Sequence, residues 1–276
     1  MTMTFHAASR EALVAAELRL IEVIDGAKAD ALSTLGTDLF GVLDLLSRES
    51  TLRRTLADAS SEPAARARLL RGLLEGKVSA SALDVLDSVV TARWSNPREF
   101  CDGIESLSRT ALLARAERDG RLDSVEDELF RLGRIVAGQP DLELVLSNPT
   151  GDRAGKLALI DGLLAGKVEP VTATLVEQLV GLPRGRRIVE GLEELAGLAA
   201  KRRERSIAYV QSAVALTDAQ EDRLSATLTR IYARPIALHV EVKPSLGGGL
   251  VIRIGDEVVD GSVAGRLDAV RRELAG

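Results

Sequence analysis

The chain has 276 residues and a formal net charge of −5, and 46% of its residues are hydrophobic but only 3% are aromatic. Its length predicts about two domains, and cores built from leucine, valine, isoleucine and alanine are typical of helical bundles. The acidic balance and the scarcity of aromatic rings argue against a general nucleic-acid-binding protein.

The sequence offers few metal ligands and no membrane-spanning segment. Cys101 is the only cysteine and His6 and His239 are the only histidines, which excludes an internal disulfide and leaves too few ligands for a zinc site. No apolar run approaches the roughly 20 residues that cross a membrane, and the first residues lack the basic start and apolar core of a signal peptide. We therefore expect a soluble cytosolic protein without a cofactor, which reaches a membrane only through partners.

A repeated segment organises most of the chain. The heptapeptide GLLEGKV, Gly72–Val78, recurs as GLLAGKV, Gly162–Val168, at an offset of 90 residues. The same offset aligns Leu52 with Leu142 and many other apolar positions, until the register slips by two residues near the sequences RWSNP and PRGRR. A constant offset over such a length indicates internal duplication. The sequence therefore predicts two tandem helical bundles that are copies of one module.

Amphipathic helices fill each copy. In the second copy, the sequence SVEDELFRLGRIVAG places Val125, Leu129, Leu132 and Val136 on one face. Ser124 precedes this apolar stripe and is followed three residues later by an acidic residue, so it is the expected N-cap of the helix.

The two bundles are expected to share a helix. The segment SLSRTALLARAERDG closes the first copy and opens the second, and we place the boundary near Ser106. On this division residues 1–106 form the first, extra bundle, residues 107–205 form the second bundle, and residues 206–276 form a C-terminal α/β domain.

One helix of the second bundle is a candidate for gripping a partner helix. The sequence PVTATLVEQLVGLP carries Leu175, Val176, Leu179 and Leu182, which are more apolar residues than one buried face requires. An apolar groove between bundle helices is the usual receptor for an amphipathic helix. Packing inside the bundle is the alternative role for each of these side chains.

The periodicity changes after Arg205. The sequences SIAYVQSAVAL and PIALHVEVKP are typical of strands, and TDAQ, Thr217–Gln220, is a capping box that opens a helix between them. LVIRI and EVVD form two further expected strands joined at Gly255-Asp256, and Ser262 is placed to cap a final helix. The pattern predicts a small domain of order β-α-β-β-β-α.

Three stretches invite a nucleotide-binding or catalytic interpretation. Gly247–Gly249 follow a loop and open a strand, whereas a dinucleotide loop follows a strand and opens a helix, so we expect these glycines to permit unusual backbone angles or close packing. GDRAGKL, Gly151–Leu157, has one residue too few between its glycines for a phosphate loop and lacks the hydroxyl residue after its lysine. His239 falls on the polar face of its strand. With no Ser/His/Asp set, the sequence predicts no catalytic residue.

The C-terminal sequence Val240–Leu274 matches the signature of a known family. The upstream sequences SNPTGDRAGKLALIDGLL, PRGRR and VQSAVALTDAQ fit the pattern of the same family. The chain resembles the δ subunit of F-type ATP synthases, the bacterial counterpart of the mitochondrial oligomycin-sensitivity-conferring protein. The positions that carry the signature, and that the resemblance offers as partner-docking residues, are Pro244, Gly248, Gly249, Gly255, Asp256, Asp260 and Ser262. The first hundred or so residues, absent from shorter members, resemble the long form found in certain high-GC bacteria.

This resemblance implies a non-catalytic stator subunit in the peripheral stalk of a proton-translocating ATP synthase. It would link the catalytic head, through N-terminal helices of the α subunits, to subunit b, so that the head resists rotation during ATP synthesis. One copy per complex is expected, peripheral to the cytoplasmic face of the bacterial cell membrane. The resemblance adds Gly185 and Arg186 to the helix-gripping groove. The rival interpretations are a helical adaptor unrelated to ATP synthase and a nucleotide-dependent enzyme.

The duplication sharpens this expectation. Two bundles have the capacity to engage two of the α-subunit N-termini, which would strengthen attachment through effective concentration. The alternative is that the first bundle is a spacer or a contact for subunit b.

Overall fold

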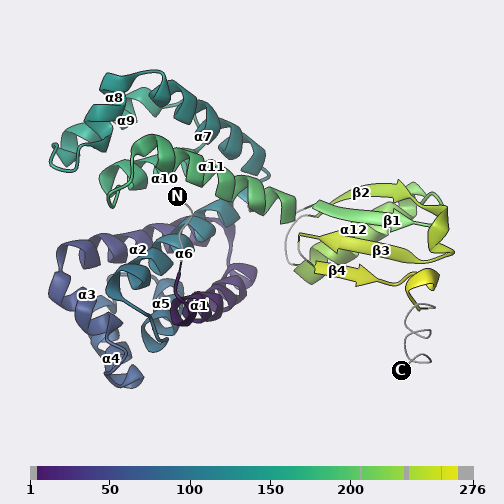
Figure 1. Ribbon diagram of the computed structural model, residues 1–276, viewed down its shortest axis with the longest axis horizontal. Helices are drawn as coiled ribbons and strands as arrows, with labels where there is room; N and C mark the ends of the chain where they lie inside the picture. Colours follow the sequence, from purple (N-terminus) through teal and green to yellow (C-terminus); the bar gives the residue numbers. More distant parts are fainter. Residues whose placement is uncertain (1–4, 206, 233–235, 256, 267–276) are drawn as a thin grey trace. The chain divides into compact units, whose positions relative to one another are not determined.

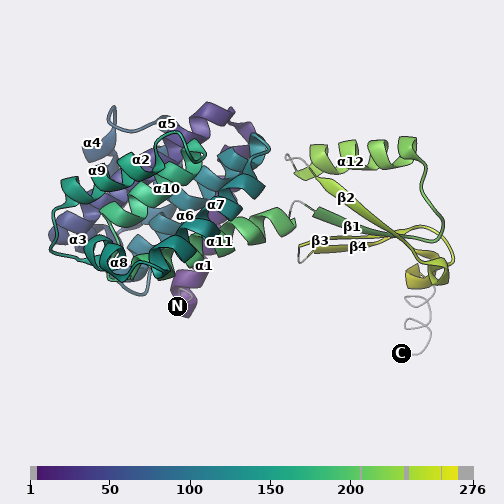
Figure 2. The same cartoon turned by 90° about the horizontal axis from the view of Figure 1, so that it is seen from above.

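The computed structural model describes residues 5–205, 207–232, 236–255 and 257–266. Its contacts divide the chain into two compact units, residues 1–199 and 200–276. The described part of the first unit is helical, and the second combines a helix with a four-stranded sheet (Figures 1 and 2). The predicted fold class, mainly α with a small C-terminal α/β module, is confirmed.

Six helices share the first core. They are α1 (Ala7–Gly26), α2 (Ala29–Arg48), α3 (Ser50–Ala57), α4 (Pro63–Leu74), α5 (Ala80–Thr91) and α6 (Pro97–Arg118). Proline stands in the first turn of α4 and of α6, where its missing N–H is tolerated. The side chains of Ser79 and Asn96 accept hydrogen bonds from the first backbone N–H groups of α5 and α6. The apolar faces of all six helices meet in one cluster.

Five further helices form the second core together with the end of α6. They are α7 (Leu122–Ala137), α8 (Pro140–Ser147), α9 (Arg153–Leu164), α10 (Pro170–Gly181) and α11 (Ile188–Arg205). Helix α6 contributes side chains to both cores. Those in the first core are Phe100, Cys101, Ile104, Leu107, Ala111 and Ala114. Those in the second core are Leu112, Leu113 and Ala116. The helix is continuous through Ser106, where the sequence placed a domain boundary.

The helices repeat at the offset seen in the sequence. The bounds of α3, α4 and α5 recur in α8, α9 and α10 exactly one period later, the starts moving from Ser50 to Pro140, from Pro63 to Arg153 and from Ala80 to Pro170, 90 residues in each case.

Side-chain contacts repeat with the same period. Asp38 on α2 accepts a hydrogen bond from the backbone N–H of Ser79 at 2.7 Å, and Glu128 on α7 accepts one from the N–H of Glu169 at 2.9 Å. These pairs fix the start of α5 against α2 and the start of α10 against α7. The agreement in contacts supports the proposal that the bundles arose by duplication.

The expected N-cap of α7 is wrong. Ser124 lies inside the helix, which begins two residues earlier at Leu122, and the residue at the N-cap position, Arg121, makes no side-chain capping bond. Leu122 is buried in the second core, and Gly120 has a φ of +67° that turns the chain sharply after α6. Burial of Leu122 therefore starts the helix before the capping signal.

The C-terminal unit is a mixed sheet with a helix on one face. Its elements are β1 (Ile207–Ser212), α12 (Asp218–Tyr232), β2 (Ala237–Val242), the 3₁₀ turn η1 (Pro244–Leu246), β3 (Leu250–Ile254) and β4 (Glu257–Asp260). The strand order is β2-β1-β3-β4, with β1 and β2 parallel and the other pairs antiparallel. Figure 2 shows α12 on one side of the sheet, where Leu228 packs with Ala208, Val210 and Ile254. This is the predicted order; residues 263–266 are helical, and the rest of the expected final helix lies outside the described residues.

The expected capping box of α12 is present in part. The side-chain oxygen of Gln220 accepts a hydrogen bond from the backbone N–H of Thr217 at 2.9 Å, as the motif requires. The hydroxyl of Thr217 donates to the same oxygen at 3.0 Å.

Candidate docking surfaces

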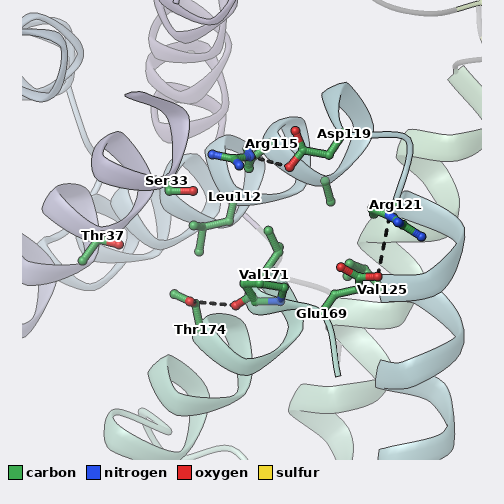
Figure 3. A pocket seen from close by; sticks show the side chains of 12 residues that line it. Ser33, Thr37, Leu112, Arg115, Asp119, Arg121, Val125, Glu169, Val171 and Thr174 are labelled. Carbon is green, nitrogen blue, oxygen red and sulfur yellow. Dashed lines mark hydrogen bonds and ion pairs between the residues drawn. The ribbon is translucent and has the colours of Figure 1, made fainter. Parts of the chain in front are cut away.

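A small cleft separates the two groups of helices. It is lined by Ser33 and Thr37 from α2, by Leu112, Arg115 and Ala116 from α6 and Asp119 just after it, by Arg121 and Val125, and by Glu169, Pro170, Val171 and Thr174 at the start of α10 (Figure 3). Leu112, Val125 and Val171 are buried and form its apolar floor. Ionic pairs form its rim, with Arg115 bonded to Asp119 at 2.5 Å. The cavity measures about 100 Å³, which is too little for a helix unless its walls separate.

Helix α2 closes one side of this cleft. It packs closely on α6, because Gly36 brings the backbone of α2 against Leu112 and the hydroxyl of Ser108 donates to the carbonyl oxygen of Gly36 at 2.7 Å. An ion pair of 2.7 Å between Arg115 and Asp30 fastens the start of α2 to α6. The first bundle therefore covers one flank of the cleft in the second.

The leucine-rich groove expected from α10 is occupied by the bundle's own packing. Leu175, Val176 and Leu179 are at most 2% exposed and belong to the second core. Leu182 is half-buried and packs against the first core. The side chains of α10 that line the cleft are Pro170, Val171 and Thr174, which the sequence did not single out.

Gly185 is exposed at a turn that brings Arg186 into an ionic cluster around the buried Glu105. Gly185 has a φ of +80°, and the residue before it, Arg184, also has a positive φ of +54°, an arrangement that costs a non-glycine residue about 1–2 kcal/mol. This turn directs both arginines at Glu105 on α6, which Arg184 meets at 2.7 Å and Arg186 contacts through a short bond.

The cluster continues along α6 and α11. Arg109 meets Glu105 at 2.7 Å, Arg186 meets Glu194 at 2.8 Å, and Arg184 meets Asp102 at 2.6 Å. Burial raises the pKa of Glu105, but the three guanidinium groups outweigh burial and hold that pKa below its usual value. The PRGRR turn thus fixes α11 to α6 by charge. The local sequence pattern shows only the pair of Glu105 with Arg109, four residues on, because Arg184 and Arg186 are 79 and 81 positions away.

An open apolar stripe runs along α1. Val14, Leu18 and Ile21 are 56%, 59% and 50% exposed, and their spacing of four and three residues puts them on one face. The opposite face of α1 is buried and faces α5, to which Arg19 is ion-paired through Asp84. The sequence shows the apolar residues of α1 but not which of its two apolar faces is covered.

The two copies also expose matching side chains on their outer helices. Leu69 and Leu73 on α4 are 38% and 37% exposed, and Leu159 and Leu163 at the corresponding positions on α9 are 40% and 42% exposed. They belong to the repeated stretch that ends in GLLEGKV and GLLAGKV. The match between the two segments therefore extends to surface residues as well as core residues.

The signature residues of the C-terminal unit build its turns. Gly248 and Gly249 have φ values of +144° and +79°, and a Cβ on Gly249 would lie 2.3 Å from the carbonyl oxygen of Gly261. The expectation of unusual backbone angles and close packing is confirmed at these positions. Pro244 opens η1, Gly255 has a φ of +57°, and Asp256 lies outside the described residues.

Asp260 and Ser262 form a turn at the end of β4. The carboxylate of Asp260 accepts hydrogen bonds from the backbone N–H and the hydroxyl of Ser262, which lower the pKa of Asp260. The Ser262 oxygen in turn accepts the N–H of Gly265 at 3.0 Å, as expected of a helix cap.

The lysine of GDRAGKL points inward. Lys156 is 7% exposed, and its ammonium group donates to the carbonyl oxygen of Asn148 at 2.9 Å. Among the described residues, no group of His, Cys, Asp and Glu side chains is arranged to hold a metal ion. No helix in the described ranges has both the length and the apolar character needed to cross a membrane.

Comparisons with known proteins identify the family. The model of the "ATP synthase delta (OSCP) subunit" family matches residues 109–274. An ATP synthase subunit delta from Thermobifida fusca is 46% identical over 97% of this chain and 98% of its own length, and one from Nocardia farcinica is 47% identical over 98% and 100%. A chain of the Toxoplasma gondii mitochondrial ATP synthase hexamer aligns with 61% of this chain and 95% of its own at a TM-score of 0.31 and 22% identity.

These relatives carry the name of a non-catalytic subunit of the ATP synthase complex. The family model covers more than half of the chain, and the curated relatives match both its helical copies and its C-terminal unit at nearly full length. The chain belongs to the ATP synthase delta (OSCP) subunit family.

Proposed function

We propose that the protein is the stator subunit that ties the catalytic head of an F-type ATP synthase to its peripheral stalk. In this role the helical unit holds N-terminal helices of the α subunits, and the C-terminal unit holds the end of subunit b. One copy serves each complex, at the cytoplasmic face of the bacterial cell membrane. Such a tether works under fluctuating torque, so slow dissociation matters more to it than fast association.

The observation that carries the head-gripping role is the open stripe on α1. Three large apolar side chains at helical spacing, each at least half exposed, form an apolar surface on which the apolar face of an amphipathic helix can pack. Exposed apolar residues that cluster on one face mark interaction sites. Leu18, at the centre of the stripe, is the expected anchor.

The cleft beside α10 is the candidate site in the second copy. Helix α10 corresponds to α5 at the offset of 90 residues, and α5 packs against α1. A helix that enters the cleft must displace Ser33 and Thr37 of α2 from its flank. We therefore expect two classes of site for the α N-terminus, a tight one on α1 and a weaker one at the cleft.

Calorimetric titration of the full chain with a peptide of the α-subunit N-terminus, about its first 25 residues, tests the proposal. We expect Leu18→Glu to abolish the tight site and Thr174→Arg, which fills the cleft, to abolish the weak one. Ile231→Glu on α12 is the matched control, because it puts the same charge at an isoleucine that is 66% exposed in the other unit.

The outcomes separate the possible roles of the first bundle. If only Thr174→Arg weakens binding, the first bundle is a spacer or a contact for subunit b. If the wild-type chain binds no peptide, the head-gripping role is wrong.

A further inference from the structure

The four-stranded sheet of the C-terminal unit has a second face that α12 does not cover. Burial along β1 alternates, with Ala208, Val210 and Ser212 buried and Tyr209 39% exposed between them. Because successive side chains of a strand point to opposite faces, Tyr209 marks the face away from α12. Figure 2 shows that α12 lies on the other side of the sheet.

Three side chains, Tyr209, His239 and Arg253, form a ladder across the strands on this face. The strand register places His239 on β2 and Arg253 on β3 directly beside Tyr209 on β1. The rings of Tyr209 and His239 meet edge to face with centroids 5.5 Å apart, and the guanidinium of Arg253 lies 5.3 Å from the centroid of the Tyr209 ring. All three side chains are exposed.

Apolar side chains flank the ladder. Val258 on β4 is opposite Arg253 and is 58% exposed. Ile207 and Val251 share the same face at half-buried positions. The surface is therefore amphipathic, with a cation over an aromatic ring at its centre and aliphatic groups around it.

The positive charge of Arg253, at the centre of this face, is not neutralised by a carboxylate of the described residues. The carboxylate of Glu241 accepts the side-chain N–H of Gln211 at 3.1 Å, and that of Asp260 accepts two hydrogen bonds from Ser262. Among the described residues, Arg253 has no carboxylate partner, only the Tyr209 ring. An incoming carboxylate would complete the bonding of Arg253, and a desolvated cation–π contact is stronger than an exposed one.

We infer that this open sheet face docks an amphipathic helix of a partner chain, with a carboxylate of that helix paired to Arg253. The inference rests on the proposed function for the idea that the C-terminal unit holds a partner within the ATP synthase. It adds the surface, the central contact and the chemistry of the occupant. A nucleic-acid strand is disfavoured because Glu241 and Asp260 flank the ladder and would repel its phosphates.

Photo-crosslinking within the purified, intact ATP synthase tests the inference. A photoreactive phenylalanine analogue replaces Tyr209 in one preparation and Arg230, on the exposed side of α12, in the other. We expect the analogue at position 209 to link to an acidic amphipathic helix of another subunit, and the one at position 230 to give no such link. Arg253→Glu should reduce the yield by about tenfold or more, because it leaves the partner's carboxylate facing a like charge.

The matched control for Arg253→Glu is Arg223→Glu, which makes the same charge change at an exposed position on α12 and should leave the yield unchanged. Lysine in place of the linked helix's carboxylate should restore the yield in Arg253→Glu. A link from position 209 only to residues 267–276 of the same chain, a link to nucleic acid, or no link would overturn the inference.

The same experiment separates this inference from the proposed function. If subunit b links to position 230 instead of 209, the proposed function stands and the docking face is wrong. If position 209 links to an acidic helix of a subunit other than b, the docking face stands and the assignment of b is wrong.

Discussion

At the scale of single residues, Glu105 is the carboxylate shared by the ionic cluster that joins α6 to α11. Its carboxylate is 5% exposed and is surrounded by Arg109, Arg184 and Arg186. Burying a carboxylate is costly, and its neutralisation by several guanidinium groups makes the cluster stable only as a whole. Removing Glu105 leaves three guanidinium groups with only Asp102 and Glu194 as carboxylate partners.

Glu105→Gln should therefore lower the free energy of unfolding of the helical unit by about 3–5 kcal/mol. Urea unfolding followed through Trp94, the only tryptophan, measures this change. Glu193→Gln on α11 removes the same charge at an exposed position and should change the stability by less than about 0.5 kcal/mol. Equal effects of the two variants would contradict the role of the cluster.

A second carboxylate makes the fold sensitive to acid. Burial raises the pKa of Glu99, but hydrogen bonds from Ser9, His6 and Asn96 outweigh burial and lower that pKa from 4.5 to about 2. Because the folded chain holds the charged form more strongly than the unfolded chain does, this contribution is complete above pH 4.5 and is lost as the pH falls towards 2.

Glu99→Gln should remove this part of the acid sensitivity. We expect the free energy of unfolding to fall less steeply between pH 4.5 and pH 2 in the variant than in the wild-type chain, while the variant is less stable at pH 7. Urea titrations at several pH values in this window measure the slopes. Parallel slopes would assign the acid sensitivity to other groups.

At the scale of elements, much of the structure was predictable because each element carries a local signal. The offset of 90 residues predicts matching helices, alternation predicts β2 and β3, and the turn at Gly255-Asp256 predicts β4. The start of α7 was missed because a buried leucine decides it, and burial depends on partners distant in sequence. The cleft was not predicted for the same reason. The residues of α10 that line it precede by about one turn the leucines that the sequence singles out.

The segments that follow α5 and α10 have different chemistry in the two copies. Trp94 and Arg184 lie in these segments, where the register of the repeat slips by two residues. Trp94 packs against Gly103 and meets the ring of Phe100 at 6.0 Å, whereas Arg184 pairs with two carboxylates of α6. An apolar contact in the first copy thus takes the place of an ionic one in the second.

The glycine hairpin of the C-terminal unit allows a paired test. Gly247 and Gly249 both have positive φ, but only a Cβ on Gly249 meets backbone at less than 3 Å. Gly247→Ala should cost about 1–2 kcal/mol from its backbone angle alone, and Gly249→Ala should cost more. Hydrogen exchange in β1 to β4 measures both costs, and equal costs would refute close packing at Gly249.

At the scale of the whole molecule, the fold class followed from the sequence but the open surfaces did not. Every described helix of the repeat has an apolar face, so the sequence predicts bundles. Which apolar residues remain exposed depends on tertiary partners, as Val14 and Leu18 on α1 show. The three-part division of the chain stays a prediction, and α6 provides its test.

A chain ending at Arg118 should fold cooperatively, whereas a chain ending at Ser106 should not. The shorter chain loses Leu107, Ala111 and Ala114 from the first core, and loss of one buried leucine alone costs about 2–5 kcal/mol. Circular dichroism with urea unfolding distinguishes the two fragments. Cooperative unfolding of the shorter fragment with similar stability would support a boundary at residue 106.

The helix that serves both cores also sets how the copies move together. Modules in a chain usually meet at a loop, whose backbone dihedral angles can change and so form a flexible hinge. Here the junction is an uninterrupted helix of 22 residues, about 33 Å long. A twist applied to one copy must strain that helix and its hydrogen bonds before the other copy can lag behind. The two helical bundles should therefore resist torsion as one unit. The additional bundle lengthens the protein without adding a flexible joint.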